Sequence, residues 1–262
     1  MLQKRVCPNG VVCRVSPILE SAGISHAFST RLGGLSRGAF AALNLGNPPG
    51  AIRDDQANLH ENYLRLLIAA NLGGRQLRRL HQVHGREIVV LRRGDALSEP
   101  QADALLTEEP EFALSIRTAD CAPILIGEKS GRIVAAVHAG WRGVVAGIVP
   151  ETLAALQRLG IPASHMLLAI GPCIGVQAFE VGEEVAEQFR TWDQTVISRP
   201  SNAKPHVDLS RAVALQARQF GLSPAQVDST DLCSVRDAEL FFSHRREAGV
   251  TGRMASVIGC RA

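Results

Sequence analysis

The chain has 262 residues, and 46% of them are apolar, so it can bury a large core. The formal net charge is only +3, and the sequence lacks the dense basic stripe with interleaved aromatics that a nucleic-acid groove needs. No apolar run reaches the roughly 18 residues of a membrane span, and the first residues lack the apolar segment of a signal peptide. We therefore expect one domain over residues 1–262, monomeric and cytoplasmic, that binds neither nucleic acid nor membranes.

The periodicity of apolar residues predicts a mixture of strands and helices in chain order. Strands are expected at 24–30, 87–91, 112–118, 123–126, 132–138, 167–170 and 252–258. Helices are expected at 56–71, 143–159, 181–190 and 208–220. Asp54 or Asp55 can cap the first helix and Asp208 the last, while Pro150 should kink the second or begin a new piece. The elements do not alternate strictly, which favours an α/β fold of the α+β type, a single-domain mixed α/β sandwich, over a Rossmann fold or a TIM barrel.

The cysteines do not form a disulfide framework. They stand at positions 7, 13, 121, 173, 233 and 260, and no pair has C-x-x-C spacing. We expect all six to remain free thiols in a reducing compartment.

Three segments near expected strand ends carry potential metal ligands. His84 closes the run HQVH, Cys121 follows Thr118-Ala-Asp, and His138 opens HAGWRG. Two imidazoles and one thiolate suit a zinc ion with an open fourth position, where water or substrate can bind. The spacings carry no motif information, and two other interpretations stay open. The same residues can be ordinary core and polar side chains, or Cys121 can be a nucleophile with His138 as its base.

Residues around these segments can serve the same chemistry. The turn after His138 leads into an expected helix, where free backbone N–H groups and Arg142 could bind an anion, although it can equally be a plain turn. Asp120 can orient a ligand, act as a general acid or base, or cap a turn. Cys173 lies in a tight turn, GPCIG, and can line the site.

Taken together, these segments and several others resemble the laccase-domain family. The matching motifs, in order, are STRLGG (29–34), LNLG (43–46), HQVHG (81–85), TADCAPIL (118–125), HAGWRG (138–143), GPCIG (171–175), FEVG (179–182), FFSHRR (241–246) and TGRMAS (251–256). The resemblance covers nearly the whole chain and implies a single-domain α/β sandwich. It also implies that His84, Cys121 and His138 are zinc ligands, with copper as a possible substitute, and that His81 is not a ligand.

The family was first described as multicopper polyphenol oxidases and is now usually described as purine nucleoside phosphorylases with adenosine deaminase and methylthioadenosine phosphorylase activity. The resemblance thus implies phosphorolysis of adenosine, inosine and methylthioadenosine, and deamination of adenosine. Arg31, Asn44 and Arg246 lie in matched motifs and join Arg142 as candidate substrate or phosphate contacts. Trp141 and Phe179 are candidates for stacking on a purine. The family often has Asn-Arg where this chain has Asn62-Tyr63, so an anion contact there would need another residue, such as Arg65.

Other functions compete with the nucleoside assignment. Four-copper oxidase chemistry needs more histidines than the eight present, and no blue-copper ligand pattern is found. A hydrolase that uses Cys121 and His138, with or without metal, stays open. Because the family includes the peptidoglycan editing factor, its substrate could be a cell-wall precursor, UDP-MurNAc-L-Ser. A non-enzymatic binding module is the fourth possibility.

Overall fold

The computed structural model describes residues 1–190, 193–201 and 203–261, whose strands form two large sheets. The first six-stranded sheet has the order β1 (Gln3–Val6), β2 (Val12–Val15), β3 (Ser25–Ser29), β14 (Met254–Gly259), β7 (Phe112–Thr118), β4 (Gln76–Arg78). The second has the order β13 (Val227–Asp228), β10 (Met166–Ile170), β8 (Ala122–Glu128), β9 (Val134–Ala139), β6 (Ala104–Thr107), β5 (Ile88–Leu91). Neighbouring strands are antiparallel, except for the parallel pairs β4–β7, β5–β6 and β10–β13.

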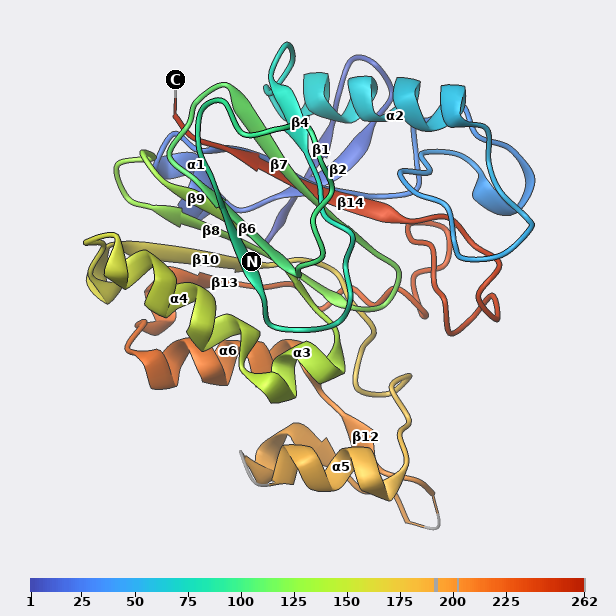
Figure 1. The fold of residues 1–262 in the computed structure, drawn as a ribbon. Helices are drawn as coiled ribbons and strands as arrows, with labels where there is room; N and C mark the ends of the chain where they lie inside the picture. Colours follow the sequence, from blue (N-terminus) through green and yellow to red (C-terminus); the bar gives the residue numbers. More distant parts are fainter. Residues whose placement is uncertain (191–192, 202, 262) are drawn as a thin grey trace.

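Helices cover the outer faces of both sheets (Figure 1). The helices are α1 (Pro17–Ser21), α2 (Gln56–Ala69), α3 (Trp141–Ala146), α4 (Ile148–Arg158), α5 (Glu183–Arg190) and α6 (Leu209–Phe220). Helix α2 lies on the first sheet, whereas α3, α4 and α6 lie on the second. A small hairpin of β11 (Ile197–Ser198) and β12 (His206–Val207) lies near α5. Short 3₁₀ turns occupy Gly38–Phe40, Ala163–His165, Gln194–Val196 and Pro224–Gln226. Within the described residues, no helix has the length and apolar character that a membrane crossing requires.

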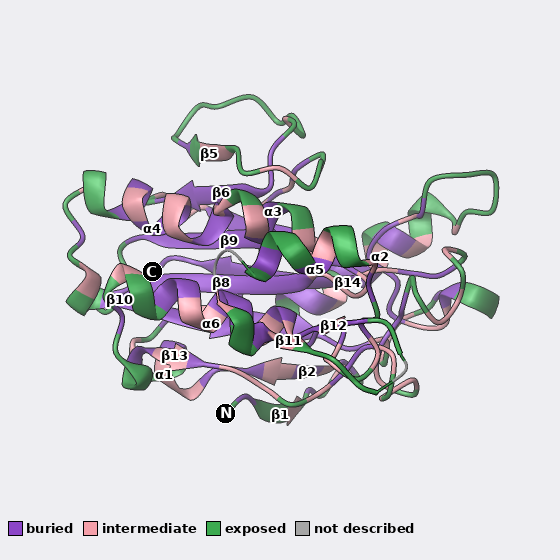
Figure 2. Ribbon diagram, turned by 90° about the horizontal axis from the view of Figure 1, so that it is seen from below, coloured by how far each residue is buried: buried purple, intermediate pink, exposed green. Residues whose placement is uncertain are grey.

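The layers follow from the alternation of side chains along the strands. Leu114 and Ile116 of β7 point between the sheets and meet Val134 and Ala136 of β9. Val137, in contrast, points to the helical side of the second sheet. Because both faces of these strands are covered, they read as continuous apolar runs, and Figure 2 shows the central strands as buried. The predicted mixed α/β sandwich is confirmed.

Helix boundaries follow local capping chemistry. The Asp55 side chain accepts from the backbone N–H of Ala57 and begins α2, and Asp208 similarly begins α6. The helical segment expected at 143–159 is divided into two helices, which confirms the alternative that a second piece begins near Pro150. Gly147 adopts a left-handed φ of 85° and separates α3 from α4, while Pro150 lies in the first turn of α4. A proline is tolerated there because its missing N–H would have no helical partner.

Candidate metal centre and its pocket

The two sheets meet at a junction that carries the candidate ligands. The chain leaves β7 in the first sheet, turns through residues 119–121 and enters β8 in the second, so Cys121 lies at the crossing. His138 is the next-to-last residue of β9, and His84 lies in the loop between β4 and β5. Their ligand atoms all lie within 4.8 Å of one another, and Cys121 Sγ is 3.8 Å from His84 Nε2.

Strand register explains why the thiol and one imidazole meet. Ala122 pairs with Ala139, so Cys121 lies opposite Gly140 just beyond the paired segment. A Cβ atom at Gly140 would come within 2.7 Å of His84 Cδ2 and 3.2 Å of Cys121 Sγ. The glycine is therefore needed so that two candidate ligands can approach the backbone of a third segment.

We expect Gly140→Ala to weaken metal binding while the protein remains folded. The added methyl group must displace the His84 ring, and misplaced ligands typically cost about ten- to a hundredfold in metal affinity. Competition for zinc with a chromogenic chelator measures the change. Gly73→Ala is the control, because a Cβ atom at Gly73 would make only an ordinary van der Waals contact with Ile68 Cγ1 (3.7 Å) and its φ is not positive. If Gly140→Ala binds zinc as tightly as Gly73→Ala, the three residues do not share one ion.

Asp103 holds two of the candidate ligands in place and was not foreseen from the sequence. It is fully buried just before β6, and its carboxylate accepts from the backbone N–H groups of Val83 (3.3 Å), His84 (3.0 Å) and Gly85 (2.6 Å). His84 has a left-handed φ of 60°, which lets successive N–H groups converge on one anion. The same carboxylate lies 2.7 Å from His138 Nδ1, which leaves Nε2 of that ring as the free ligand atom.

Cys121 and His138 shift each other's pKa in opposite directions. Burial raises the pKa of the Cys121 thiol, but His138 and His84 more than offset it and bring the pKa to about 6. Burial lowers the pKa of His138, but Cys121 and Asp103 raise it to about 9. The opposite directions of these two shifts favour a thiolate beside an imidazolium. A soft anionic sulfur beside two imidazole nitrogens is a donor set that fits a zinc or copper ion.

The cluster opens into a cavity of about 810 Å³, a volume in the range of small-molecule sites. His138 is buried at its base, Cys121 is half-buried and His84 is exposed. Trp141 and Phe179 line the same cavity. Its other lining residues are Asn47, Pro48, Pro49, Arg53, His81, Gln82, Glu99, Arg117, Thr118, Ala119, Asp120, Ile174, Leu209, His244, Arg245 and Arg253. The open side of the ligand cluster therefore faces a space that can admit substrate.

Asp120 lines the cavity, but both its carboxylate oxygens are already engaged. One accepts from the Ser234 hydroxyl (2.6 Å) and the other from the backbone N–H of Arg245 (2.7 Å). Asp120 therefore ties two distant segments to the cavity wall. The expected cavity residue Cys173 is buried and does not line the cavity, although its neighbour Ile174 does.

The arginines predicted as substrate or phosphate contacts are not among the residues that line the cavity. Arg142 is exposed and its guanidinium lies 4.5 Å from the centre of the Trp141 ring. Arg31 donates to the carbonyl oxygens of Ala41 and Ala238. Arg246 donates to the carbonyl oxygens of Ser234, Val235 and Phe241, and it pairs with Glu247. The structure thus does not bring these arginines to the ligand cluster, and their role as phosphate contacts stays a prediction.

Asn44 is likewise buried outside the lining, but it shapes the wall. Its amide N–H donates to Asp54 (2.9 Å), and its oxygen accepts from the backbone N–H groups of Gly46 and Arg253. Tyr63, which stands where the family often has arginine, is buried against the first sheet, and the Arg79 guanidinium lies over its ring.

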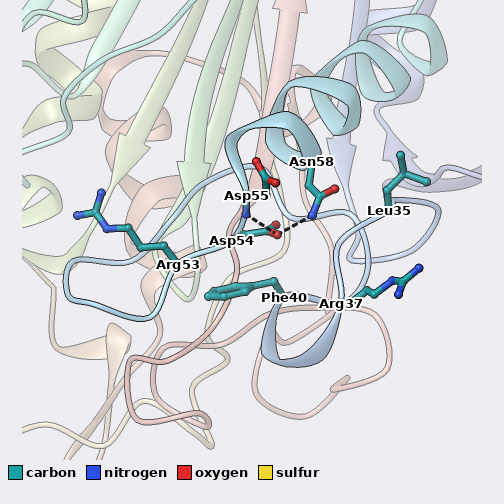
Figure 3. A pocket seen from close by; sticks show the side chains of 7 residues that line it. All are labelled: Leu35, Arg37, Phe40, Arg53, Asp54, Asp55 and Asn58. Carbon is teal, nitrogen blue, oxygen red and sulfur yellow. Dashed lines mark hydrogen bonds between the residues drawn. The ribbon is translucent and has the colours of Figure 1, made fainter.

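A second depression of about 520 Å³ lies around Asp54 (Figure 3). Leu35, Arg37, Phe40, Arg53, Asp55 and Asn58 complete its lining. The Asp54 carboxylate accepts from the Asp55 N–H and from the amides of Asn58 and Asn44, which holds its pKa below the usual range although burial acts to raise it. Asp54 is thus an anchor for the 44–54 segment, and its oxygens are not available to a ligand.

Comparison with known proteins identifies the family. The family model described as multi-copper polyphenol oxidoreductase laccase matches residues 25–261. The chain belongs to this family. The laccase-domain resemblance seen in the motifs is therefore confirmed across nearly the whole sequence.

Two named relatives and one solved structure are similar to this chain over nearly its whole length. A "purine nucleoside phosphorylase" from Deinococcus radiodurans is 37% identical over 247 residues, covering 93% of this chain and 92% of the relative. "Purine nucleoside phosphorylase YfiH" from Escherichia coli is 36% identical, covering 91% of this chain and 95% of the relative. The crystal structure of YlmD from Geobacillus stearothermophilus matches with a TM-score of 0.89 and 31% identity, covering 100% of this chain and 99% of that one. These names support an enzyme, and the His-Cys-His cluster is compatible with a metal.

Proposed function

We propose that this laccase-domain protein is a zinc-dependent purine nucleoside enzyme. It would cleave adenosine, inosine and methylthioadenosine with phosphate and deaminate adenosine. The observation that carries the proposal is the position of the cluster, since His84, Cys121 and His138 converge at the base of a cavity large enough for a nucleoside. The names of the relatives supply the substrate class. We further propose that the protein works as a monomer in the cytoplasm on small molecules alone.

Phosphorolysis sets clear requirements for the cavity. A phosphate oxygen forms a bond to the ribose C1′ while the C1′–N9 bond breaks. The electron pair of the broken C1′–N9 bond leaves with the purine. The proton of the hydrogen phosphate passes to that purine, so the products are free base and ribose 1-phosphate. The site must hold phosphate and ribose together, since proximity and orientation supply much of the acceleration. A bound zinc ion would supply Lewis-acid activation at its open position.

Two aromatic residues are suited to hold the base. Trp141 begins α3 and Phe179 follows the GPCIG turn, and both line the cavity. Arg245 fixes the second of them, since its guanidinium donates to the carbonyl oxygens of Ala178 and Glu180 on either side of Phe179. Stacking on aromatic faces tolerates any purine, which agrees with a broad set of nucleosides.

We expect purified, zinc-loaded protein to convert inosine and phosphate to hypoxanthine and ribose 1-phosphate. With adenosine it should release adenine and also form inosine. Liquid chromatography of the bases and an assay for ribose 1-phosphate measure both reactions, and metal analysis should find about one zinc per chain. If neither product forms with zinc bound, the nucleoside assignment fails, and hydrolysis of a cell-wall precursor becomes the leading function.

A second candidate function has an observation of its own. The Cys121 thiolate beside the His138 imidazolium is the pair that a cysteine hydrolase uses. The two functions respond oppositely to a chelator. Removing the metal should abolish the nucleoside reactions, whereas a cysteine hydrolase should retain its activity and lose it on alkylation of Cys121. Reloading with copper instead of zinc then tests which ion supports turnover.

A further inference from the structure

Two arginines that the sequence analysis did not single out project from one face of the first sheet. Arg117 lies near the end of β7, and Arg253 directly precedes β14. Arg117 of β7 lies opposite Ala255 of β14, and Arg253 is two residues before Ala255 along the chain. Side chains two residues apart along a strand share a face, and such diagonal neighbours are within reach of long side chains. Both arginines line the cavity that holds the candidate metal ligands.

The bare backbone of Gly46 lies beneath both side chains. A Cβ atom at this position would come within 2.8 Å of Arg117 Cδ and 3.4 Å of Arg253 Cγ. The buried Asn44 oxygen accepts from the backbone N–H groups of Gly46 (3.2 Å) and Arg253 (2.9 Å), which fixes these two segments relative to each other. The aliphatic parts of both arginine side chains therefore converge on Gly46, in a part of the cavity wall that the Asn44 hydrogen bonds hold in place.

Each guanidinium is anchored on one side and unpaired on the other. Arg117 Nη2 donates to the Leu80 carbonyl (2.9 Å) and to Glu99 Oε2 (3.2 Å). Arg253 Nη1 donates to the carbonyls of Thr251 and Gly252, both at 3.0 Å. Across the described part of the chain, the Nε and second Nη groups of both arginines have no acceptor. These donors are held in place and remain available to a ligand.

The charges around the pair favour an added anion. Burial lowers the pKa of Arg253, the charges of Asp120 and Cys121 raise it, and Arg117 lowers it. Arg253 is thus close enough to Cys121, a candidate metal ligand, and to Arg117 for both charges to affect its pKa. Glu99 offsets part of the Arg117 charge, and it also pairs with Arg79 at 2.8 Å. The oxygens of Asp120 are already engaged by Ser234 and Arg245, and within the described residues neither arginine side chain donates a hydrogen bond to Asp120.

We propose that Arg117 and Arg253 form the subsite for the phosphate co-substrate, beside the His-Cys-His cluster. The planar guanidinium fork matches the oxygens of a phosphate, and two forks from adjacent strands can share one dianion. A phosphoryl group carried by a nucleotide has the same chemistry, but the site is assigned to free phosphate because phosphorolysis consumes it. This inference rests on the proposed function, and it replaces Arg142 as the main phosphate contact.

Equilibrium binding of inorganic phosphate tests the subsite without turnover. Zinc-loaded wild type, Arg117→Gln, Arg253→Gln and Arg253→Lys are titrated with phosphate by calorimetry in the absence of nucleoside. We expect each glutamine variant to bind phosphate about ten- to a hundredfold more weakly, as the loss of a charge-assisted contact implies. Arg253→Lys keeps the charge but loses the planar guanidinium fork. Its phosphate affinity should therefore lie between those of wild type and Arg253→Gln. Thermal unfolding and zinc content check that each variant is folded and loaded. Arg92→Gln removes an exposed arginine outside the cavity and should bind phosphate like wild type.

Steady-state kinetics then separate the possible sources of the anion. The glutamine variants should raise the KM for phosphate by the same factor and leave the KM for inosine close to wild type. Unchanged phosphate binding in folded variants overturns the subsite, as does a larger effect of Arg142→Ala than of either variant. A raised KM for a nucleoside 5′-monophosphate with normal phosphate binding also overturns it, in favour of a substrate-borne phosphoryl group. If wild type binds phosphate through both arginines but forms no nucleoside product, the proposed function fails while the anion subsite stands.

Discussion

Replacing Cys121 with alanine should abolish both metal binding and nucleoside turnover while leaving the protein folded. The thiolate is the one anionic donor of the His-Cys-His cluster, and two imidazoles alone hold zinc far less well. The large core between and outside the sheets does not depend on the ion, in contrast to a zinc finger. The free energy of unfolding of the metal-free variant should therefore change by about 0.5–3 kcal/mol, as for an ordinary point mutant.

Metal analysis, product chromatography and chemical denaturation of the same preparation measure these three quantities. Cys260→Ala is the matched control, because Cys260 is a buried thiol between the sheets and is not among the residues that line the cavity. It should retain metal and activity. Full zinc content in Cys121→Ala would show that the ion, if present, is held elsewhere. Activity that survives zinc removal in wild type but not in Cys121→Ala would favour the cysteine hydrolase.

Replacing Asp103 with alanine should damage the site and the fold together. The change leaves His138 without its partner and three backbone N–H groups of the 83–85 loop without their acceptor. Breaking a buried charged pair costs about 3–5 kcal/mol of stability. Loss of the group that orients a ligand imidazole should weaken metal affinity by about ten- to a hundredfold.

The contribution of the Asp103 carboxylate to stability should depend on pH. Burial acts to raise the pKa of Asp103, but the hydrogen bonds from His138, Gly85 and His84 hold it below its usual value. A carboxyl with a lowered folded pKa stabilises the protein above its unfolded pKa, and this contribution is lost as the pH falls through the folded pKa. The stability gap between wild type and Asp103→Asn should therefore be largest near neutral pH and shrink in acid. Urea denaturation of metal-free protein across this range measures the gap, and a gap independent of pH would contradict the role of the charged carboxylate.

The sequence was sufficient to predict the longer elements, because their signals are local. Caps at Asp55 and Asp208 mark helix starts, and seven-residue strands such as β7, with apolar residues at Phe112, Leu114 and Ile116, are long enough to recognise. The short strands β1, β2, β4 and β6 and the two-residue strands β11, β12 and β13 were missed. β1 is an exposed, charged edge strand without alternation, and each of these strands has at most four residues. Gly147 was not foreseen as the helix break, since a glycine within an apolar run gives no sign of its φ.

Only part of the candidate site was predicted, because the sequence does not show which distant residues the fold brings together. His84, Cys121 and His138 came from motifs, whereas their spacing along the chain gave no geometric information. Asp103 could have been noticed as a lone carboxylate at the start of the apolar run 102–106, where a buried charge needs partners. Arg117 and Arg253 are 136 positions apart (253 − 117), and only the pairing of β7 with β14 brings them together. Arg253 lies in the matched motif TGRMAS, but its proximity to Arg117 becomes visible only when the strand register is known.

The three candidate ligands are not equivalent in how the chain supports them. Cys121 and His138 adjoin paired strands of one sheet, but His84 is exposed on a loop whose backbone is held by a single carboxylate. An ion leaving the site would therefore part from His84 first and stay transiently on the other two donors. The rate of metal exchange would then be set by the opening of the 83–85 loop rather than by unfolding of the sheets. Zinc would then exchange without opening of the two sheets.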